Sequence, residues 1–185
     1  PSNGQKFACC PNSNSKDLEL AIQSAQNAFP KWSTINRNQR SDYLLSIANE
    51  IKTNIEEFAE AESIDNGKPL NLSKTLDIPR SIKNLEFFAH LTKDYKGKTF
   101  YQDDVVSHIM KKPLGIVGTI SPWNLPLYLL TWKIAPALVT GNCVIAKPSE
   151  LTPYTAYLLS KVCMKVNLPD GVLNILHGEG SSIGR

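Results

Sequence analysis

Residues 115–150 constrain the fold of this chain more than any other stretch, because two short β-branched runs flank a long apolar one. The flanking runs, 115–120 and 143–146, are bounded by Gly, Pro and Lys and predict two buried strands. The run between them, 125–138, is apolar almost all round and predicts a buried helix that stops at 140–142. A strand–helix–strand unit of this length predicts a parallel crossover, which places the chain in the α/β class.

Two polar turns follow the two predicted strands: Ser121–Asn124 after the first and Lys147–Glu150 after the second. In an open parallel sheet, ligands bind outside the carboxyl ends of the strands, so both turns should face the same edge. Asn124 offers an amide there, and the lysine and glutamate of the second turn could hold vicinal hydroxyls such as those of a ribose. The alternative is an asparagine that satisfies its own loop and an exposed ion pair that adds little stability. The adjacency of the two turns favours a binding site.

The remaining sequence divides into a helical first half and a strand-containing second half, with a change of hydrophobic period near Lys96. Gly67 should end a helix in the left-handed conformation, and Pro79 should kink another helix unless it marks a helix start. Ser15 is the expected N-cap of the first helix. The other expected elements are a short strand at 6–10, helices at 15–32, 37–53, 55–64, 72–91 and 152–166, a hairpin at 96–112 that turns at Asp103–Asp104, and a strand at 172–176.

The 185 residues are enough for one domain with a hydrophobic core. The net charge of +3 is spread along the chain, which gives no reason to expect a nucleic-acid or membrane-surface partner. No signal peptide is visible, and the longest apolar run contains Lys133 and is too short to span a bilayer. The four cysteines form no disulfide framework and no C-x-x-C motif, and the three histidines are scattered. These features predict a reducing, cytoplasmic setting and no metal site.

Two weaker features each allow two explanations. Gly178 and Gly180 follow the last predicted strand, where they could serve the phosphate side of a ligand or form a tight turn with positive φ. Lys133 lies in an apolar helix, where a lysine usually extends its ammonium group to solvent. No cysteine has a visible His or Glu partner that would activate it, so none of the four is expected to be a nucleophile.

Several ordered motifs resemble one family over the whole chain. Ile-Ser-Pro-Trp-Asn-Leu-Pro at 120–126 is followed by Trp-Lys-Ile-Ala-Pro-Ala-Leu at 132–138, a Gly-Asn pair and the Lys-Pro-Ser-Glu turn. Asp-Asn-Gly-Lys-Pro at 65–69 and the segment 168–175 fit in the same order. Together these motifs resemble the coenzyme-domain core of the NAD(P)-dependent aldehyde dehydrogenase superfamily. The sequence around them is most similar to the branch that includes 2-aminomuconic semialdehyde dehydrogenase.

The resemblance implies a parallel Rossmann-like sheet with packed helices and a protruding hairpin, in an enzyme that oxidises an aldehyde with NAD(P). Asn124 matches the family's oxyanion donor, and Lys133 matches a lysine near a proposed proton relay. Lys147 and Glu150 match positions that hold the adenosine ribose, which favours NAD over NADP because a 2′-phosphate would face a carboxylate. The expected cofactor-binding residues are Ile120, Ser121, Pro122, Trp123, Lys147, Ser149, Glu150, Gly178 and Gly180.

The resemblance also implies a division into a helical part at 1–95, a hairpin of the oligomerisation region at 96–112, and the first βαβ units of the cofactor domain at 113–185. Family members are much longer, so the chain is expected to be the N-terminal portion of a larger protein. The nucleophilic cysteine and the general-base glutamate would belong to later segments. The implied partners are a small-molecule aldehyde and further copies of the chain in a dimer or tetramer. The alternative is an inactive or truncated relative that acts as a binding or structural subunit.

Overall fold

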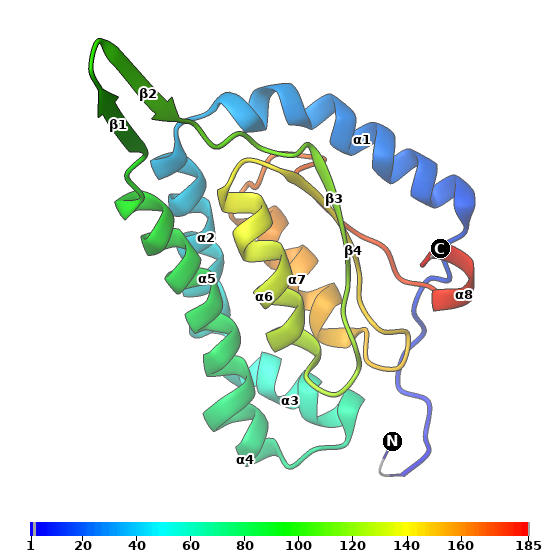
Figure 1. The fold of residues 1–185 in the computed structure, drawn as a ribbon. Helices are drawn as coiled ribbons and strands as arrows, with labels where there is room; N and C mark the ends of the chain where they lie inside the picture. The colour runs from blue at the N-terminus through cyan, green and yellow to red at the C-terminus, as the bar shows by residue number, and fades with distance from the viewer. Residues whose placement is uncertain (2, 185) are drawn as a thin grey trace.

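The computed structural model describes residues 1 and 3–184, in which packed helices surround a small parallel sheet and a hairpin projects from the body (Figure 1). This arrangement confirms the predicted α/β class. The helices are α1 (Ser15–Thr34), α2 (Arg37–Thr53), α3 (Ile55–Asn66), α4 (Leu70–Leu72), the π-helical segment η1 (Ser73–Asp77), α5 (Ile78–Asp94), α6 (Pro126–Val139), α7 (Tyr154–Lys165) and α8 (Gly180–Ile183). The strands are β1 (Lys98–Gln102), β2 (Val105–Ile109), β3 (Ile116–Ile120), β4 (Cys143–Lys147) and β5 (Leu173–Ile175).

The parallel sheet has the order β3-β4-β5, with α6 and α7 as the two crossover connections. Figure 1 shows the sheet between α1 on one side and the pair α6 and α7 on the other. Because β4 is the central strand and is covered by helices, its residues are almost all buried, as the continuous apolar run predicts. The predicted parallel crossover is therefore confirmed.

The hydrophobic core lies where α2, α5 and α6 pack together and continues under α7 and the sheet. The helix α6 is the centre of this packing, because apolar side chains surround it and most of them are fully buried. The largest fully buried side chains are Trp32, Leu44, Ile47, Ile51, Phe58, Ile78, Leu85, Leu127, Leu130, Ile134, Leu138 and Leu159.

A buried arginine joins the ends of two helices in this body. Arg40 on α2 donates to the carbonyl oxygen of Val139 at 3.0 Å, near the end of α6. It also donates to the carbonyl oxygens of Trp32 at 3.3 Å, Ser33 at 3.4 Å and Ile35 at 2.5 Å, at the end of α1. The last carbonyls of a helix have no partner inside the helix, so a buried cation is well placed to satisfy them.

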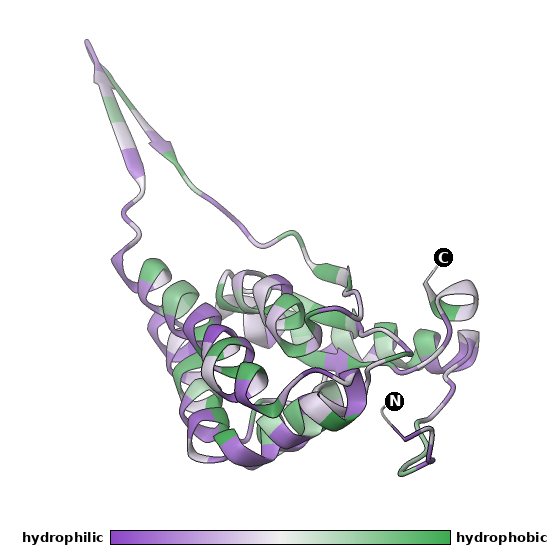
Figure 2. Cartoon of the chain, turned by 90° about the horizontal axis from the view of Figure 1, so that it is seen from below, coloured by the Kyte–Doolittle hydropathy of each residue, from purple (hydrophilic) through white to green (hydrophobic). Residues whose placement is uncertain are grey.

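The hairpin of β1 and β2 extends away from the helical body, and all ten of its strand residues are exposed (Figure 2). The two strands pair antiparallel from Lys98 opposite Ile109 to Gln102 opposite Val105. Asp103 has a φ of 47° and forms the turn with the next aspartate, as the sequence predicts. Apolar side chains such as Tyr101 and Val105 are therefore left uncovered on this arm.

Three local predictions need correction. Residues 6–10 form no strand, because this exposed segment runs beside no other strand with which it could pair. The N-cap of α1 is Asn14 rather than Ser15: Asn14 accepts from the backbone of Lys16, and the side chain of Asp17 accepts from the backbone of Asn14. The expected helix at 72–91 is interrupted by the π-helical segment η1, and Pro79 lies in the first turn of α5, as the helix-start alternative predicts.

The residues just before α1 contact the segment that follows β5, beside the sheet. The backbone N–H of Ser13 donates to the carbonyl oxygen of His177 at 2.7 Å, and the N–H of Glu179 donates to the side chain of Asn12 at 3.3 Å. Helix α1, which begins just after these contacts, crosses all three strands of the parallel sheet (Figure 1). Among the described residues, we find no helix with the length and apolar character needed to cross a membrane.

Candidate functional site

The two polar turns predicted from the sequence leave the sheet side by side. In the parallel register, Ile120 at the end of β3 lies opposite Lys147 at the end of β4. The backbone N–H of Ser121 then donates to the carbonyl oxygen of Lys147 at 3.1 Å, which continues the ladder by one bond into the turns. Both turns therefore emerge at the carboxyl edge of the sheet, as expected.

Lys147 and Glu150 form an ion pair across the second turn, with Nζ and Oε2 2.7 Å apart. The Lys147 side chain is 7% exposed, whereas that of Glu150 is 46% exposed, so the alternative of an exposed surface pair is wrong for the lysine. The hydrogen bond from Lys147 holds the pKa of the Glu150 carboxyl below its ordinary value of 4.5, and backbone N–H groups of Glu150 and Gly180 add to this effect. An ionised carboxylate beside a buried ammonium group presents acceptors and donors to the same small volume.

The other residues of this turn and of the segment after β5 support the pair. The Ser149 hydroxyl accepts from the backbone of Leu151 at 3.2 Å, so it closes its own turn. Gly180 begins α8, and a Cβ built on it would lie 3.9 Å from the Glu150 carboxylate. The tight turn with positive φ proposed for Gly178 and Gly180 is wrong, because neither residue has a positive φ. A larger residue would be crowded at position 178, because a Cβ there would lie 3.0 Å from the Ile183 side chain and from the backbone of Ser13.

A cavity of about 460 Å³ opens along the ends of β3 and β4, under α1. Its walls are mostly apolar, with Thr119, Ile120 and Lys147 at the side of the turns. The hydroxyl groups of Thr119 and Ser121 are buried and have no hydrogen-bond partner among the residues that the structure describes. Thr119 belongs to the cavity wall and Ser121 does not, so the polar side of this apolar cavity consists of Thr119 and Lys147, which suits a ligand with both flat apolar and hydroxylated parts.

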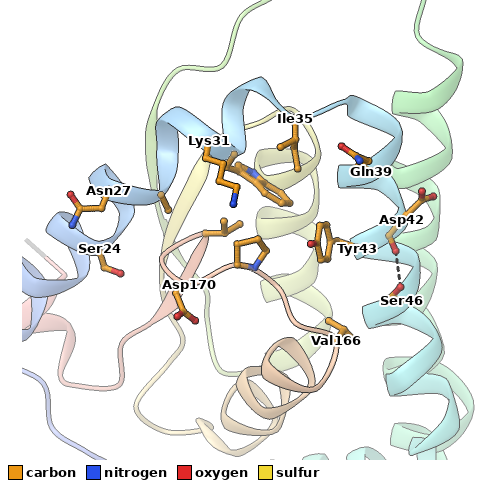
Figure 3. A pocket seen from close by; sticks show the side chains of 14 residues that line it. Ser24, Asn27, Lys31, Ile35, Gln39, Asp42, Tyr43, Ser46, Val166 and Asp170 are labelled. Atoms are coloured by element: carbon orange, nitrogen blue, oxygen red, sulfur yellow. Dashed lines mark hydrogen bonds between the residues drawn. The ribbon is translucent and has the colours of Figure 1, made fainter.

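A larger cavity, of about 750 Å³, lies elsewhere, between α1, α2 and the turn before β5 (Figure 3). Figure 3 shows Lys31, Tyr43 and Asp170 around it. None of the predicted site residues lines this cavity. Its volume alone therefore gives no reason to place the site there.

The Trp123–Asn124 turn is fixed through its backbone. The carbonyl oxygen of Trp123 accepts from the side chains of Asn66 at 2.8 Å and Thr152 at 3.4 Å, and the carbonyl oxygen of Asn124 accepts from Lys68 at 3.3 Å. Within the described part of the chain, the Asn124 side chain has no hydrogen-bond partner and is exposed together with Pro122 and Trp123. The alternative in which Asn124 serves only its own turn finds no support in these contacts.

Lys133 lies on the exposed side of α6, and its ammonium group donates to the carbonyl oxygen of Ile120 at the end of β3. The lysine therefore reaches the edge of the sheet where the two turns emerge. Part of this geometry fits the expected solvent-facing lysine, because the side chain is exposed. The contact with β3 nevertheless places its charge beside the first turn.

His177 follows β5 and is the histidine nearest to this edge. Its ring is partly buried, and Nδ1 has no hydrogen-bond partner in the described structure. Burial, and secondarily the charge of Lys147, lower the pKa of His177 below its ordinary value of 6.5. The folded state therefore holds this ring in its neutral form.

We expect the folded state to lose stability as the pH falls through about 6.5, because the unfolded chain then binds a proton that the buried His177 ring resists. The loss should stop once the pH lies below the lowered pKa of the folded state. A His177→Gln variant should lack this part of the pH dependence, and a His90→Gln variant, changed at an exposed histidine on α5, should retain it. The thermal midpoint of unfolding, measured across this pH range, tests the prediction. A His177→Gln variant with the same pH dependence as the wild type would contradict it.

The cysteines do not provide a nucleophile in this part of the chain. Burial raises the pKa of the Cys143 thiol to about 11 and that of Cys163 to about 12, so both are protonated at neutral pH. Partial desolvation, and secondarily the charge of Asp65, raise the pKa of the Cys10 thiol, although the residue lies in the exposed N-terminal segment with Cys9. Residues 1 and 3–184 contain no group of three or more His, Cys, Asp or Glu side chains arranged to hold a metal ion.

A parallel sheet with helices on both faces and a polar site at its carboxyl edge is typical of dinucleotide-binding α/β proteins. The chain belongs to the aldehyde dehydrogenase family, whose profile matches residues 1–185. It is 46% identical to 2-aminomuconic semialdehyde dehydrogenase of Homo sapiens, over all of this chain and 38% of that protein. The chain therefore spans well under half the length of this relative.

Two solved structures of complexes with NAD share the fold. Betaine aldehyde dehydrogenase from Staphylococcus aureus, in complex with NAD+, superposes with a TM-score of 0.94 at 35% identity, over 100% of this chain and 38% of that one. PnpE in complex with nicotinamide adenine dinucleotide gives a TM-score of 0.94 at 34% identity, over 98% of this chain and 37% of that one. These matches confirm the resemblance drawn from the motifs.

Sequence reasoning assigned no role to the residues that hold the first turn. Asn66 and Lys68 belong to the Asp-Asn-Gly-Lys-Pro segment, which was used only as a family motif. Thr152, which follows the second turn, contacts the first. One sequence signal could have pointed to these two residues: Asn66 and Lys68 stand on either side of Gly67, which ends α3. A helix-ending turn of this kind holds its neighbouring side chains in a fixed direction.

Proposed function

We propose that the chain is the cofactor-binding portion of an enzyme that oxidises an aldehyde to a carboxylic acid with NAD. The observation that carries this proposal is the buried Lys147 paired with Glu150 at the sheet edge, beside the turn that presents Asn124. The descriptions of the NAD-bound family structures support the choice of cofactor. The chain spans 38% of the human relative, so the activity of the whole protein is part of the proposal.

The residues at the sheet edge fit a dinucleotide. Lys147 can donate to, and Glu150 accept from, the hydroxyls of the adenosine ribose, which no single neutral side chain does as well. Ile120, Ser121, Pro122 and Trp123 would line the cleft beside it, while Ser149 would shape the second turn and Gly178 and Gly180 would leave room for the phosphate side. When bound, NAD supplies the hydride acceptor for the oxidation.

Asn124 would act at the aldehyde rather than at the cofactor. Attack of a thiolate on an aldehyde places negative charge on oxygen, and a preorganised N–H donor stabilises that charge. The Asn124 amide is exposed and has no described hydrogen-bond partner, and its backbone is held by Lys68. Lys133 is the second residue for which we propose a role in the reaction, because its charge lies at the end of β3 next to this turn.

The preference for NAD over NADP is expected to depend on Glu150. A Glu150→Gln variant should discriminate less against NADP by about 1–2 kcal/mol, because it removes a negative charge that would face the 2′-phosphate. Dissociation constants for both cofactors, measured in the natural protein that contains residues 1–185, test this. A matched control is Glu60→Gln, an exposed glutamate on α3 that is not among the proposed site residues. Unchanged affinities in Glu150→Gln would remove this residue from the ribose site.

The reaction itself is tested by NADH formation when the natural protein that contains this chain is given aldehydes and NAD. Aldehyde-dependent NADH formation supports the proposal. Binding of NAD without any turnover over a broad range of aldehydes would favour an inactive relative that serves as a binding or structural subunit. Absence of both binding and turnover would contradict the proposed function.

We further propose the division into a helical part at 1–95, an oligomerisation hairpin at 96–112 and the first cofactor-binding units at 113–185. The exposed apolar residues of the hairpin support a role in assembly as a dimer or tetramer. The four free cysteines support a reducing, cytoplasmic location. Sedimentation of the natural protein, with and without residues 98–109, tests the assembly.

A further inference from the structure

The segment Asp65–Lys68 spans the end of α3 and reaches the surroundings of both turns of the candidate site. Asn66 donates from Nδ2 to the carbonyl oxygen of Trp123 at 2.8 Å, and Lys68 donates from Nζ to the carbonyl oxygen of Asn124 at 3.3 Å. Asp65 accepts from the backbone N–H of Tyr154 at 2.8 Å, at the start of α7. The three side chains thus connect the helical half of the chain to the first turn and to the helix that follows the second.

Lys68 is itself held in place by two buried carboxylates. Its Nζ lies 2.6 Å from an oxygen of Asp77 on η1 and 3.3 Å from an oxygen of Glu62 on α3, and none of the three side chains is more than 9% exposed. An ammonium group has three N–H donors, and here these face Asp77, Glu62 and the carbonyl oxygen of Asn124. The position of the lysine relative to the helical half is therefore fixed, and the turn is fixed relative to the lysine.

The direction of the Asn124 side chain depends on this backbone. Holding the carbonyl groups of two consecutive residues fixes the plane of the peptide between them and limits rotation of the next one, so the Cα–Cβ bond of Asn124 keeps one direction. Pro122 and Pro126 restrict the chain on either side. An amide that must meet developing charge gains most when it needs no reorientation.

We propose that Asn66 and Lys68 are positioning residues, which orient Asn124 by holding the carbonyl groups of its turn, with Glu62 and Asp77 fixing Lys68. This inference rests on the proposed function for its effect on catalysis. It assigns a role to the Asp-Asn-Gly-Lys segment beyond that of ending α3. Asn66 contacts only the backbone carbonyl of Trp123, and neither residue touches the Lys147–Glu150 pair or the Asn124 amide, so their effect is indirect.

The test uses Asn66→Ala, Lys68→Met and Lys68→Arg in the natural protein that contains residues 1–185. Lys68→Met should lower kcat about 100-fold, the scale of misplacing a catalytic group by about 1 Å. Asn66→Ala should lower kcat about tenfold, the scale of one hydrogen bond. Lys68→Arg, which keeps the charge and donors, should recover part of the loss. Because the proposed ribose-binding pair, Lys147 and Glu150, lies on the other turn, KM for NAD should change less than kcat in all three.

Two matched controls separate positioning from general stability. Asn71→Ala and Lys74→Met change exposed residues just after the same segment, and Lys74 pairs with Glu56 away from both turns. Amide hydrogen exchange at Ser121 and Leu129, whose N–H groups donate to the carbonyl oxygens of Lys147 and Leu125 at the two ends of the turn, is the readout that does not need activity. It should become about tenfold faster in Asn66→Ala and Lys68→Met and stay unchanged in the controls.

The outcomes are distinguishable. Should Lys68→Met not fold, Asn66→Ala decides, because Asn66 lies outside the buried charge cluster. Wild-type kcat in Asn66→Ala, or unchanged exchange at Ser121 and Leu129 in both variants, would overturn the proposal. If the wild-type protein oxidises no aldehyde, the proposed function fails, and the exchange data alone then decide whether the segment fixes the turn.

Discussion

Replacing Asn124 with alanine should lower kcat for aldehyde oxidation by about 10²–10³, the typical cost of losing one oxyanion donor. The side chain is exposed at the carboxyl edge of the sheet, its amide has no hydrogen-bond partner among the described residues, and its backbone is held by Lys68. The variant should fold, because the residue lies on a turn and not in the core. NAD affinity should change little, since Lys147 and Glu150 remain in place. Measuring kcat and the thermal midpoint on one preparation tests this prediction.

The opposite pattern would remove Asn124 from the reaction. If the asparagine only stabilised its own turn, alanine would lower the thermal midpoint and leave kcat per folded molecule unchanged. Asn142→Ala is a suitable comparison, because the side chain of Asn142 clearly has a structural role. It accepts from the backbone N–H groups of Leu114 and Gly115 at 2.7 and 3.0 Å. That variant should show a lowered midpoint, the result that Asn124→Ala should not give.

Arg40→Met should lower the free energy of unfolding by about 3 kcal/mol, as is typical when one partner of a buried charged contact is removed. Arg40 is 8% exposed and donates to four backbone carbonyls at the ends of α1 and α6. Methionine can fill much of the space but donates no hydrogen bond, so these carbonyls would be left buried without partners. Urea denaturation compared with the wild type measures the change.

Arg37→Met is the matched control for this prediction. Arg37 lies one turn earlier on α2, is exposed, and donates to a single carbonyl, that of Tyr95 at 2.6 Å. Its replacement should cost about 0.5 kcal/mol, the usual scale for an exposed polar contact. Equal losses in the two variants would contradict the special role of Arg40 at the helix ends.

The elements of the fold could largely be predicted because each depends on local pattern. The period of apolar residues gave the helices, β-branched runs gave the strands of the parallel sheet, and Gly67 ended α3 with a φ of 84° as expected. The predicted strand at 6–10 failed because a strand also needs a neighbour, which no local pattern reveals. The π-helical segment before α5 likewise has no simple sequence signal, although Pro79 correctly marked a helix start.

The candidate site was predictable to the same extent. Lys147, Glu150 and Asn124 could be placed together because consecutive parallel strands bring their carboxyl ends to one edge. The contacts from Asn66 and Lys68 could not, because they join residues more than fifty positions apart in sequence. The sequence also does not show how exposed the two members of the ion pair are: Lys147 is buried, whereas Glu150 is half-exposed.

The contact between residues 12–13 and residues 177–179 beside the sheet has a consequence for the order in which this protein acquires its structure. Ser13 bonds to His177, and α1 packs against strands that lie about eighty or more residues further along the chain. Closing so long a loop costs conformational entropy before any contact rewards it. During synthesis, the apolar face of α1 therefore cannot be fully covered until β5 has left the ribosome.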